Sequence, residues 1–495
     1  MELEWMQRDC EYLRSNVRQV QNLEQTQEVR LSEGMPDIGR VVCVWGHTLV
    51  RSKQWHPEGV TVSGSMELSV LYAPEDGTEP RSVAVSLPFS GRWSFAESQR
   101  EGAAVVTAQL CSADARALSA RKLMVRGNAG VQLQAWERTK AAFYSPGQLP
   151  QDVQLLQKTY PAMLPREAGE KQFGVEETLH LPSEPRKLLT CTMQPVVTEQ
   201  TAAAGRVVFR GECRVHAVYM DQDEQLCSAD VALPFAQLAE LDRDYDKDAL
   251  AQVLPALVSG EVTLTDGVAQ LQCTLAGQYV IYDRCLVEVA EDAYSPFMPV
   301  EPHWETLELP MLLEQRQEEV PLQVQWEAEA ARVVDAWAFT MQPTVYRDGD
   351  TASVELPGQM QVLYYDGEGK LHCDSRSWNG ALQLPVGQNG AVAAELLQLR
   401  PCTTMQMGQQ LGVEGGAALA LTTAARQQIP MIAALTVGQR QAPDPMRPTL
   451  ILQRMGEAGL WELAKLCGST VEAIEQANGL QQEPKPGQML LIPVL

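Results

Sequence analysis

The residues with the clearest potential for chemistry are four alternating acids, Asp242, Asp244, Asp246 and Asp248. Alternating carboxylates are typical of calcium loops, which also need a glycine at the sixth position and a glutamate at the twelfth. This segment has neither residue. We therefore interpret it as a solvated acidic loop and expect no metal site there.

Other fragments of catalytic motifs are equally incomplete. Ser119 and Lys122 have the spacing of a serine–lysine acyl-transfer pair, but the Ser-Asp-Asn and Lys-Thr-Gly elements that accompany such a pair are missing. The segment Gly367–Lys370 lacks the first glycine and the final hydroxyl residue of a phosphate-binding loop. Because no nucleophile is paired with a base, we expect a protein that is not an enzyme and uses no cofactor.

The six histidines lie far apart in the sequence. His216 occupies a polar position in an alternating strand pattern, which predicts a side chain on the surface. The segment His303–Glu305 fits either the lining of a pocket or the packing of one domain against another.

Composition restricts the class of partner. Lysine and arginine number 39 and aspartate and glutamate 63, so the net charge is −24. Such a chain repels phosphates, which disfavours nucleic acid and anionic lipid as partners. No run approaches the ~18–20 apolar residues of a membrane span. The first residues carry acids within the first four positions and no apolar core, so we expect no secretion signal. The eleven cysteines form no CxxC and no zinc-spaced cluster, so we expect reduced thiols in an intracellular protein.

The 495-residue length predicts three to four domains, and an internal repeat divides the chain. Apolar residues alternate and end on tyrosine in three segments, Leu68–Tyr72, Val215–Tyr219 and Met360–Tyr364. Period-two alternation predicts a strand with one buried face. A polar turn and a second strand follow each segment, and a Leu-Pro pair then predicts the end of each hairpin, because proline cannot continue a ladder of hydrogen bonds.

Two identical sequence runs also support the repeat: Tyr144-Ser145-Pro146 recurs at Tyr294–Pro296, and Thr192–Pro195 recurs at Thr340–Pro343. We predict three related β-rich domains over residues 25–162, 163–305 and 306–438. The spacing of Tyr12, Leu13, Val17 and Val20 predicts an amphipathic helix within residues 1–24. Weaker patterns favour helices near Leu307–Glu319 and Phe235–Leu254, and the proline-rich segment 439–448 predicts an extended linker.

Residues 449–495 have a different pattern. A short apolar strand at Leu450–Leu452 precedes a helix that contains Leu460, Leu463 and Ala464 on one face. Gly468 ends this helix, and Ser469 with Glu472 predicts the capping box of a second helix, over about Thr470–Ala477. An apolar strand, Met489–Pro493, completes an order of strand, helix, helix, strand.

This last segment resembles a LysM domain in the runs Leu460–Ala464, Val471–Ile474, Ala477–Leu480 and Pro486–Pro493. The resemblance implies a ligand groove between two loops, here Gly456–Leu460 and Asn478–Gln482. Its candidate binding residues are Gly456, Glu457, Gly459, Leu460, Trp461, Asn478, Gly479, Leu480 and Gln481. Trp461 fits either the small core or a contact with a partner. The first loop lacks the hydroxyl residue usual in the family, which counts against glycan binding.

The upstream repeats resemble the SPOCS (spore coat) domain through their strands that end on tyrosine, the Leu-Pro-Phe runs that close their hairpins and the Tyr-Ser-Pro runs. The expected fold is therefore mainly β, with three SPOCS-like domains in tandem and a βααβ LysM domain. This layout is similar to that of clostridial spore coat morphogenetic proteins. The resemblance implies a scaffold in the mother-cell cytoplasm whose partners are the morphogenetic ATPase, bound by the LysM domain at the forespore surface, or other coat proteins. The alternative is a protein that binds the N-acetylglucosamine chains of peptidoglycan.

Overall fold

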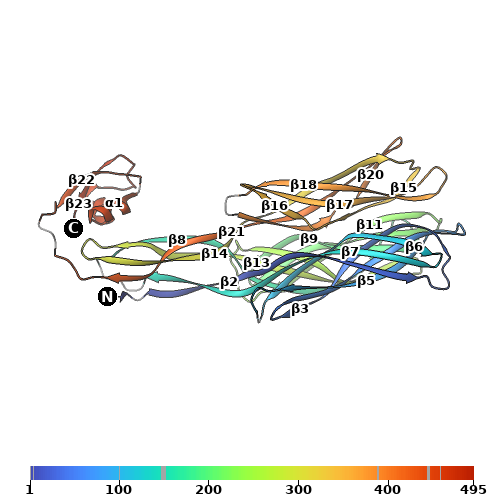
Figure 1. Ribbon diagram of the computed structural model, residues 1–495, viewed down its shortest axis with the longest axis horizontal. Helices are drawn as coiled ribbons and strands as arrows, with labels where there is room; N and C mark the ends of the chain where they lie inside the picture. Colours follow the sequence, from blue (N-terminus) through green and yellow to red (C-terminus); the bar gives the residue numbers. More distant parts are fainter. Residues whose placement is uncertain are drawn as a thin grey trace.

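The computed structural model describes residues 2–3, 5–99, 101–146, 152–386, 390–442, 446–457 and 459–495. The chain is mainly β, as predicted, and consists of antiparallel sheets with two short helices near its C-terminal end (Figure 1). Neither helix in this part of the chain is long and apolar enough to cross a membrane.

The first group of strands forms two antiparallel sheets, with the orders β2-β7-β6 and β3-β4-β5. The first strand therefore pairs with the last, and the three central strands form a sheet of their own. The bounds are β2 (Trp5–Arg30), β3 (Ile38–His56), β4 (Gly59–Pro74), β5 (Arg81–Ser94), β6 (Ala103–Ser119) and β7 (Lys122–Pro146).

The second group repeats this pairing, with the orders β8-β13-β12 and β9-β10-β11. Its bounds are β8 (Gln154–Leu179), β9 (Pro185–Ala203), β10 (Arg206–Asp221), β11 (Leu226–Glu240), β12 (Leu250–Thr265) and β13 (Val268–Tyr294).

The third group follows the same plan, but two of its strands are interrupted. Both β15 and β16 pair with β17, which also pairs with β18; both β19 and β20 pair with β21, which also pairs with β14 and with the short β1 (Glu2–Leu3). The bounds are β14 (Val300–Glu327), β15 (Arg332–Thr340), β16 (Thr344–Asp348), β17 (Thr351–Tyr365), β18 (Leu371–Pro385), β19 (Gly390–Leu399), β20 (Thr403–Met407) and β21 (Gln410–Val437).

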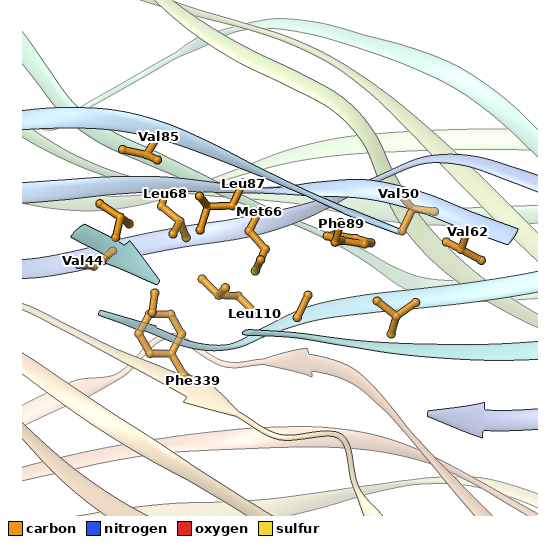
Figure 2. Close-up of a cluster of buried hydrophobic side chains, with 14 of the residues drawn as sticks. Val44, Val50, Val62, Met66, Leu68, Val85, Leu87, Phe89, Leu110 and Phe339 are labelled. Atoms are coloured by element: carbon orange, nitrogen blue, oxygen red, sulfur yellow. The ribbon is translucent and has the colours of Figure 1, made fainter. Parts of the chain in front are cut away.

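The two sheets of each group enclose an apolar core. In the first group, burial alternates strictly along the end of β5, where Val85, Leu87, Phe89 and Trp93 all point inward. Figure 2 shows this cluster, to which β15 of the third group adds Phe339. The period-two pattern in the sequence thus corresponds to a real buried face, and the three predicted hairpins are present as β4/β5, β10/β11 and β17/β18.

In each group the first and last strands continue beyond their sheet as a ribbon, which β1 joins at the end of the third. We call these extensions the ribbon tips: residues 5–14 pair with 137–146, residues 154–164 with 283–294, and residues 300–310 with 426–437. The three tips pack together and share one buried apolar cluster, to which all six strands contribute. Its members are Cys10, Ala141, Phe143, Ala162, Leu164, Val287, Val289, Leu307, Leu309, Ile429 and Met431.

Polar side chains also join the groups away from the tips. The buried carboxylate of Glu395, on β19, accepts hydrogen bonds from Arg18 of the first group at 2.8 Å and from Gln252 of the second at 2.9 Å. His216 of β10 lies between Asp230, at 2.9 Å, and Asp335 of the third group, at 3.1 Å. The prediction that His216 is a surface side chain is therefore wrong, because the polar face of β10 is covered by another group of strands.

The predicted N-terminal helix within residues 1–24 is also wrong, since these residues belong mainly to β2. Tyr12 packs on the ribbon-tip cluster while its neighbour Leu13 is buried in a second cluster, so β2 buries apolar side chains on both faces. A register shift between Ser15 and Val17 then changes the phase of the alternation. Together these features give apolar spacings that imitate those of a helix.

The other two helical predictions fail for related reasons. Residues 307–319 lie inside β14, where Leu307 and Leu309 alternate into the ribbon-tip cluster. Residues 235–254 cover the end of β11, a loop and the start of β12.

The predicted limits of the β-rich domains and the role of proline also need correction. The limits 24/25, 162/163 and 305/306 fall inside β2, β8 and β14, because each group begins with the ribbon strand that joins it to its neighbours. Pro88 and Pro234 lie within β5 and β11 rather than at their ends. Both strands are sheet edges, where a missing N–H breaks no ladder.

One prediction tests whether the ribbon tips meet. The sulfur atoms of Cys10, on the first ribbon, and Cys285, on the second, are 3.0 Å apart. The hydrogen bond with Cys285 and the nearby Arg166 guanidinium lower the pKa of Cys10 to about 7. Diamide, which takes up the two thiol hydrogens, should therefore form a Cys10–Cys285 disulfide, and faster at pH 8 than at pH 6 because the thiolate is the nucleophile. Mass spectrometry of an unreduced digest detects the cross-linked peptides. A Cys10 that remains a thiol would contradict this arrangement.

A second prediction concerns the link between the second and third groups. Burial alone would lower the pKa of His216, but Asp335 and Asp230 raise it from 6.5 to about 10. Because the pKa of His216 is higher in the folded chain than in the unfolded one, its ionisation stabilises the fold fully below pH 6.5. This contribution to the free energy of unfolding declines to almost nothing as the pH approaches 10. His216→Asn should thus lower the free energy of unfolding by about 3 kcal/mol at pH 6, with little difference from the unsubstituted chain at pH 10. Urea titration at the two pH values measures this, with the exposed His56→Asn as control. An equal loss at both values would refute the ion pair.

Candidate functional site

The candidate site lies in the C-terminal module, residues 449–495, which stands at the end of the molecule beside the ribbon tips (Figure 1). Strands β22 (Leu450–Arg454) and β23 (Met489–Pro493) pair antiparallel, and helices α1 (Gly459–Cys467) and α2 (Val471–Asn478) lie between them in the sequence. The helices and the sheet enclose a small core. Its buried members are Met455, Leu460, Leu463, Ala464, Cys467, Ile474, Leu490 and Ile492, together with Tyr294 of β13.

Local signals explain why the helices end where they do. Gly468 has φ 64°, in the left-handed region that favours glycine, and it follows the last residue of α1. The N-cap of α2 is Thr470, whose hydroxyl accepts a hydrogen bond from the Ala473 N–H. The predicted capping box of Ser469 and Glu472 is therefore not the cap of α2: the cap is Thr470, and Ala473, three residues after it, has no side chain to return a hydrogen bond.

The second predicted binding loop, Asn478–Gln482, is largely committed to holding the module together. The Asn478 side chain donates to the carbonyls of Ile474, at 2.8 Å, and Leu491, at 2.6 Å, and it accepts from the Leu491 N–H at 2.8 Å. Gly479 is the left-handed C-cap of α2, and Leu480 packs on the core. Gln481 is exposed. Asn478 therefore clamps helix α2 to strand β23.

The first predicted loop divides in a similar way. Gly456 and Glu457 are exposed, Gly459 begins α1, and Leu460 belongs to the buried core. Ala458, which the loop also contains, lies outside the described residues. Leu460 is therefore unavailable to a ligand.

Trp461 is the predicted residue that makes a contact outside the module. Its indole Nε1 donates to Asp292 Oδ2 at 2.8 Å, and its ring meets Tyr294 edge-on with a centroid separation of 4.8 Å. Lys465, one turn further along α1 and on the same face, binds the same carboxylate at 2.7 and 2.9 Å. Burial would raise the pKa of Asp292, but the hydrogen bonds from Lys465 and Trp461 outweigh it and lower that pKa.

A further surface was missed in the sequence. On β23, Leu490 and Ile492 point into the core, so Met489 points outward, and Leu450 and Leu452 of β22 share this outer face. Their exposed fractions are 47%, 51% and 62%, and Leu466 on α1 is 80% exposed. The signal was present in Leu450–Leu452, because a strand with apolar residues on both faces has one face without a core to cover it.

These apolar side chains are concentrated in the module. Of the eighteen large apolar side chains that are exposed in the described part of the chain, five lie in the module, which is about a tenth of the length. Concentrations of this kind mark interaction surfaces in proteins.

The remaining candidates offer no comparable site. Within the described residues, no group of three or more His, Cys, Asp or Glu side chains could hold a metal ion. In the acidic segment 242–248, Tyr245 is buried and donates to Glu167. On β14, the Trp304 indole donates to the carbonyl of Glu291 while its ring stays exposed. No protein-family model, curated protein or solved structure matches this chain.

The role of Asn478 gives a prediction. Asn478→Ala leaves the N–H and carbonyl of Leu491 without their side-chain partner, which should lower the stability of the module by about 1–3 kcal/mol. Hydrogen exchange of the Leu491 amide should accelerate accordingly, while Gln481→Ala, an exposed change three residues later, should leave it unchanged. Equal exchange in both variants would show that Asn478 is not a clamp.

Proposed function

We propose that this chain is a non-enzymatic scaffold for assembly of the spore coat or envelope, and that its C-terminal module binds a partner protein. The partner is the morphogenetic ATPase at the forespore surface, in the mother-cell cytoplasm. We further propose that the three groups of strands are SPOCS-like domains and that the module is a LysM domain. The threefold repetition of one strand-pairing plan supports the first assignment, and the order β22, α1, α2, β23 supports the second.

The observation that carries the proposal is the exposed apolar surface of the module. Leu450, Leu452 and Met489 lie together on the outer face of a two-stranded sheet that no other described strand covers. Large apolar side chains at the centre of an interface provide much of its binding energy. A module tethered to a large body also raises the local concentration of its binding surface around an assembled coat.

The geometry favours a protein partner over a glycan. A glycan groove needs polar groups that are free to pair with sugar hydroxyls. The amide of Asn478 is used by the backbone of the module itself, and Leu460 is buried. The β-rich groups would make lateral contacts through their faces, because prolines at Pro88 and Pro234 blunt two of the sheet edges.

Substitution of the apolar face tests this function. Leu452→Glu with Met489→Glu in the full chain should reduce retention of the purified ATPase in a pull-down by at least about tenfold, since charges replace apolar contacts at the centre of the interface. Leu238→Glu, at a similarly exposed position on β11, is the matched control and should bind normally.

Two outcomes would contradict the proposal. One is equal retention by the double variant and the control. The other is failure of the unsubstituted chain to retain the ATPase while it sediments with peptidoglycan in a manner competed by chitooligosaccharide, which would favour the glycan-binding function.

A further inference from the structure

The contact between α1 and the second ribbon tip has a defined chemistry. Within the described residues, the hydrogen bonds and ion pairs that join the module to the strands all end on one carboxylate, that of Asp292. An aromatic ring, Tyr294, lies beside that carboxylate and packs on Trp461. One acid and one ring therefore supply the side-chain recognition.

The spacing of these groups follows from regular backbone geometry. Asp292 and Tyr294 are two residues apart at the end of β13, so both side chains point to the same side of the strand. Trp461 and Lys465 are four residues apart on α1 and share one face of the helix. Any extended segment with an acid two residues before an aromatic residue can present the same pair of groups to this face.

The chain contains an internal comparison. The run Tyr294–Pro296 repeats Tyr144–Pro146 at the tip of the first ribbon, but Ala142 stands there at the position of Asp292. The module lies on the tip that has the carboxylate. The carboxylate is therefore a difference between the two tips that share the tyrosine.

The contact of Tyr294 with α1 also suits displacement by a segment of another protein. The hydroxyl of Tyr294 is buried and has no hydrogen-bond partner among the described residues, so the intramolecular segment leaves a polar atom unpaired. A segment with phenylalanine at this position has no hydroxyl to bury and would avoid that cost. The tether keeps Asp292 and Tyr294 close to the module, and this compensates for an imperfect fit.

We propose that the face of α1 formed by Trp461 and Lys465 recognises an extended segment of a partner protein in which an acidic residue precedes an aromatic residue by two positions. Asp292 and Tyr294 occupy this face in the free chain, and the partner segment displaces them. This inference rests on the proposed function and adds the chemistry of the partner and a built-in competitor.

The test uses the full chain and a fluorescent peptide that reproduces residues 286–297, which contain the acid and the ring. The double variant Asp292→Asn with Tyr294→Ala empties the face of α1, so it should bind the peptide at least tenfold more tightly than the unsubstituted chain in an anisotropy titration. Glu288→Gln, an exposed change on the same ribbon, is the matched control and should bind like the unsubstituted chain. A peptide with asparagine and alanine at the two positions should bind none of these proteins.

A further substitution locates the binding face. Lys465→Met, added to the double variant, should remove most of the gained affinity, and because Lys465 is exposed the module should remain folded. Equal peptide affinity in the unsubstituted chain and the double variant would overturn the inference, as would full affinity after Lys465→Met. These results are separable from the proposed function: loss of peptide binding with intact ATPase retention refutes only this inference, whereas loss of ATPase retention with the expected peptide behaviour refutes only the ATPase assignment.

Discussion

The shared apolar cluster at the ribbon tips is the constraint on which the rest of the structure depends. Each group of strands has its own core between two sheets, whereas the tips bury most of their apolar residues against one another. Cys10 and Met431, at opposite ends of the β-rich chain, belong to the same cluster. The three groups therefore form one connected body, held by contacts between residues that are distant in sequence.

The β-rich body and the C-terminal module therefore contribute different features. The tips bring the end of β13, with Asp292 and Tyr294, to the place where the C-terminal module docks. The connecting segment is fastened nearby, because Arg440 pairs with Asp152 and lies over the ring of Phe297. The β-rich body thus sets the position of the module, while the module carries the exposed apolar and charged side chains that suit contact with another protein.

Period-two alternation and turn residues in the sequence predicted the strands and hairpins that depend on neighbouring residues. Alternation at Leu68, Val70 and Tyr72 identified β4, because these side chains share the face that is buried in the core of the first group, and the polar turn after them identified the hairpin with β5. The same logic failed at Tyr12 and Leu13, where β2 packs on both faces. It failed again at His216, whose polar position is covered by the third group. In each case the contact that buries the side chain comes from a strand far away in the sequence. The periodicity of one segment carries no information about such a strand.

The candidate site shows the same limit. The sequence left Trp461 open between the small core and a contact with a partner, because Asp292, to which it donates, lies 169 residues earlier and has no motif of its own. Asn478 was predicted to bind a ligand, although its amide holds α2 to β23, because spacing along a loop does not reveal where a side chain points.

Native-state hydrogen exchange after Leu164→Ala tests the central claim, that the tips form a single cooperative core, most directly. Leu164 is fully buried at the tip of the second ribbon, and its loss should cost about 2–5 kcal/mol. If the tips form one core, amides in residues 5–14 and 300–310 of the other ribbons should lose protection together with those in 154–164. Loss of protection confined to the second ribbon would contradict the account.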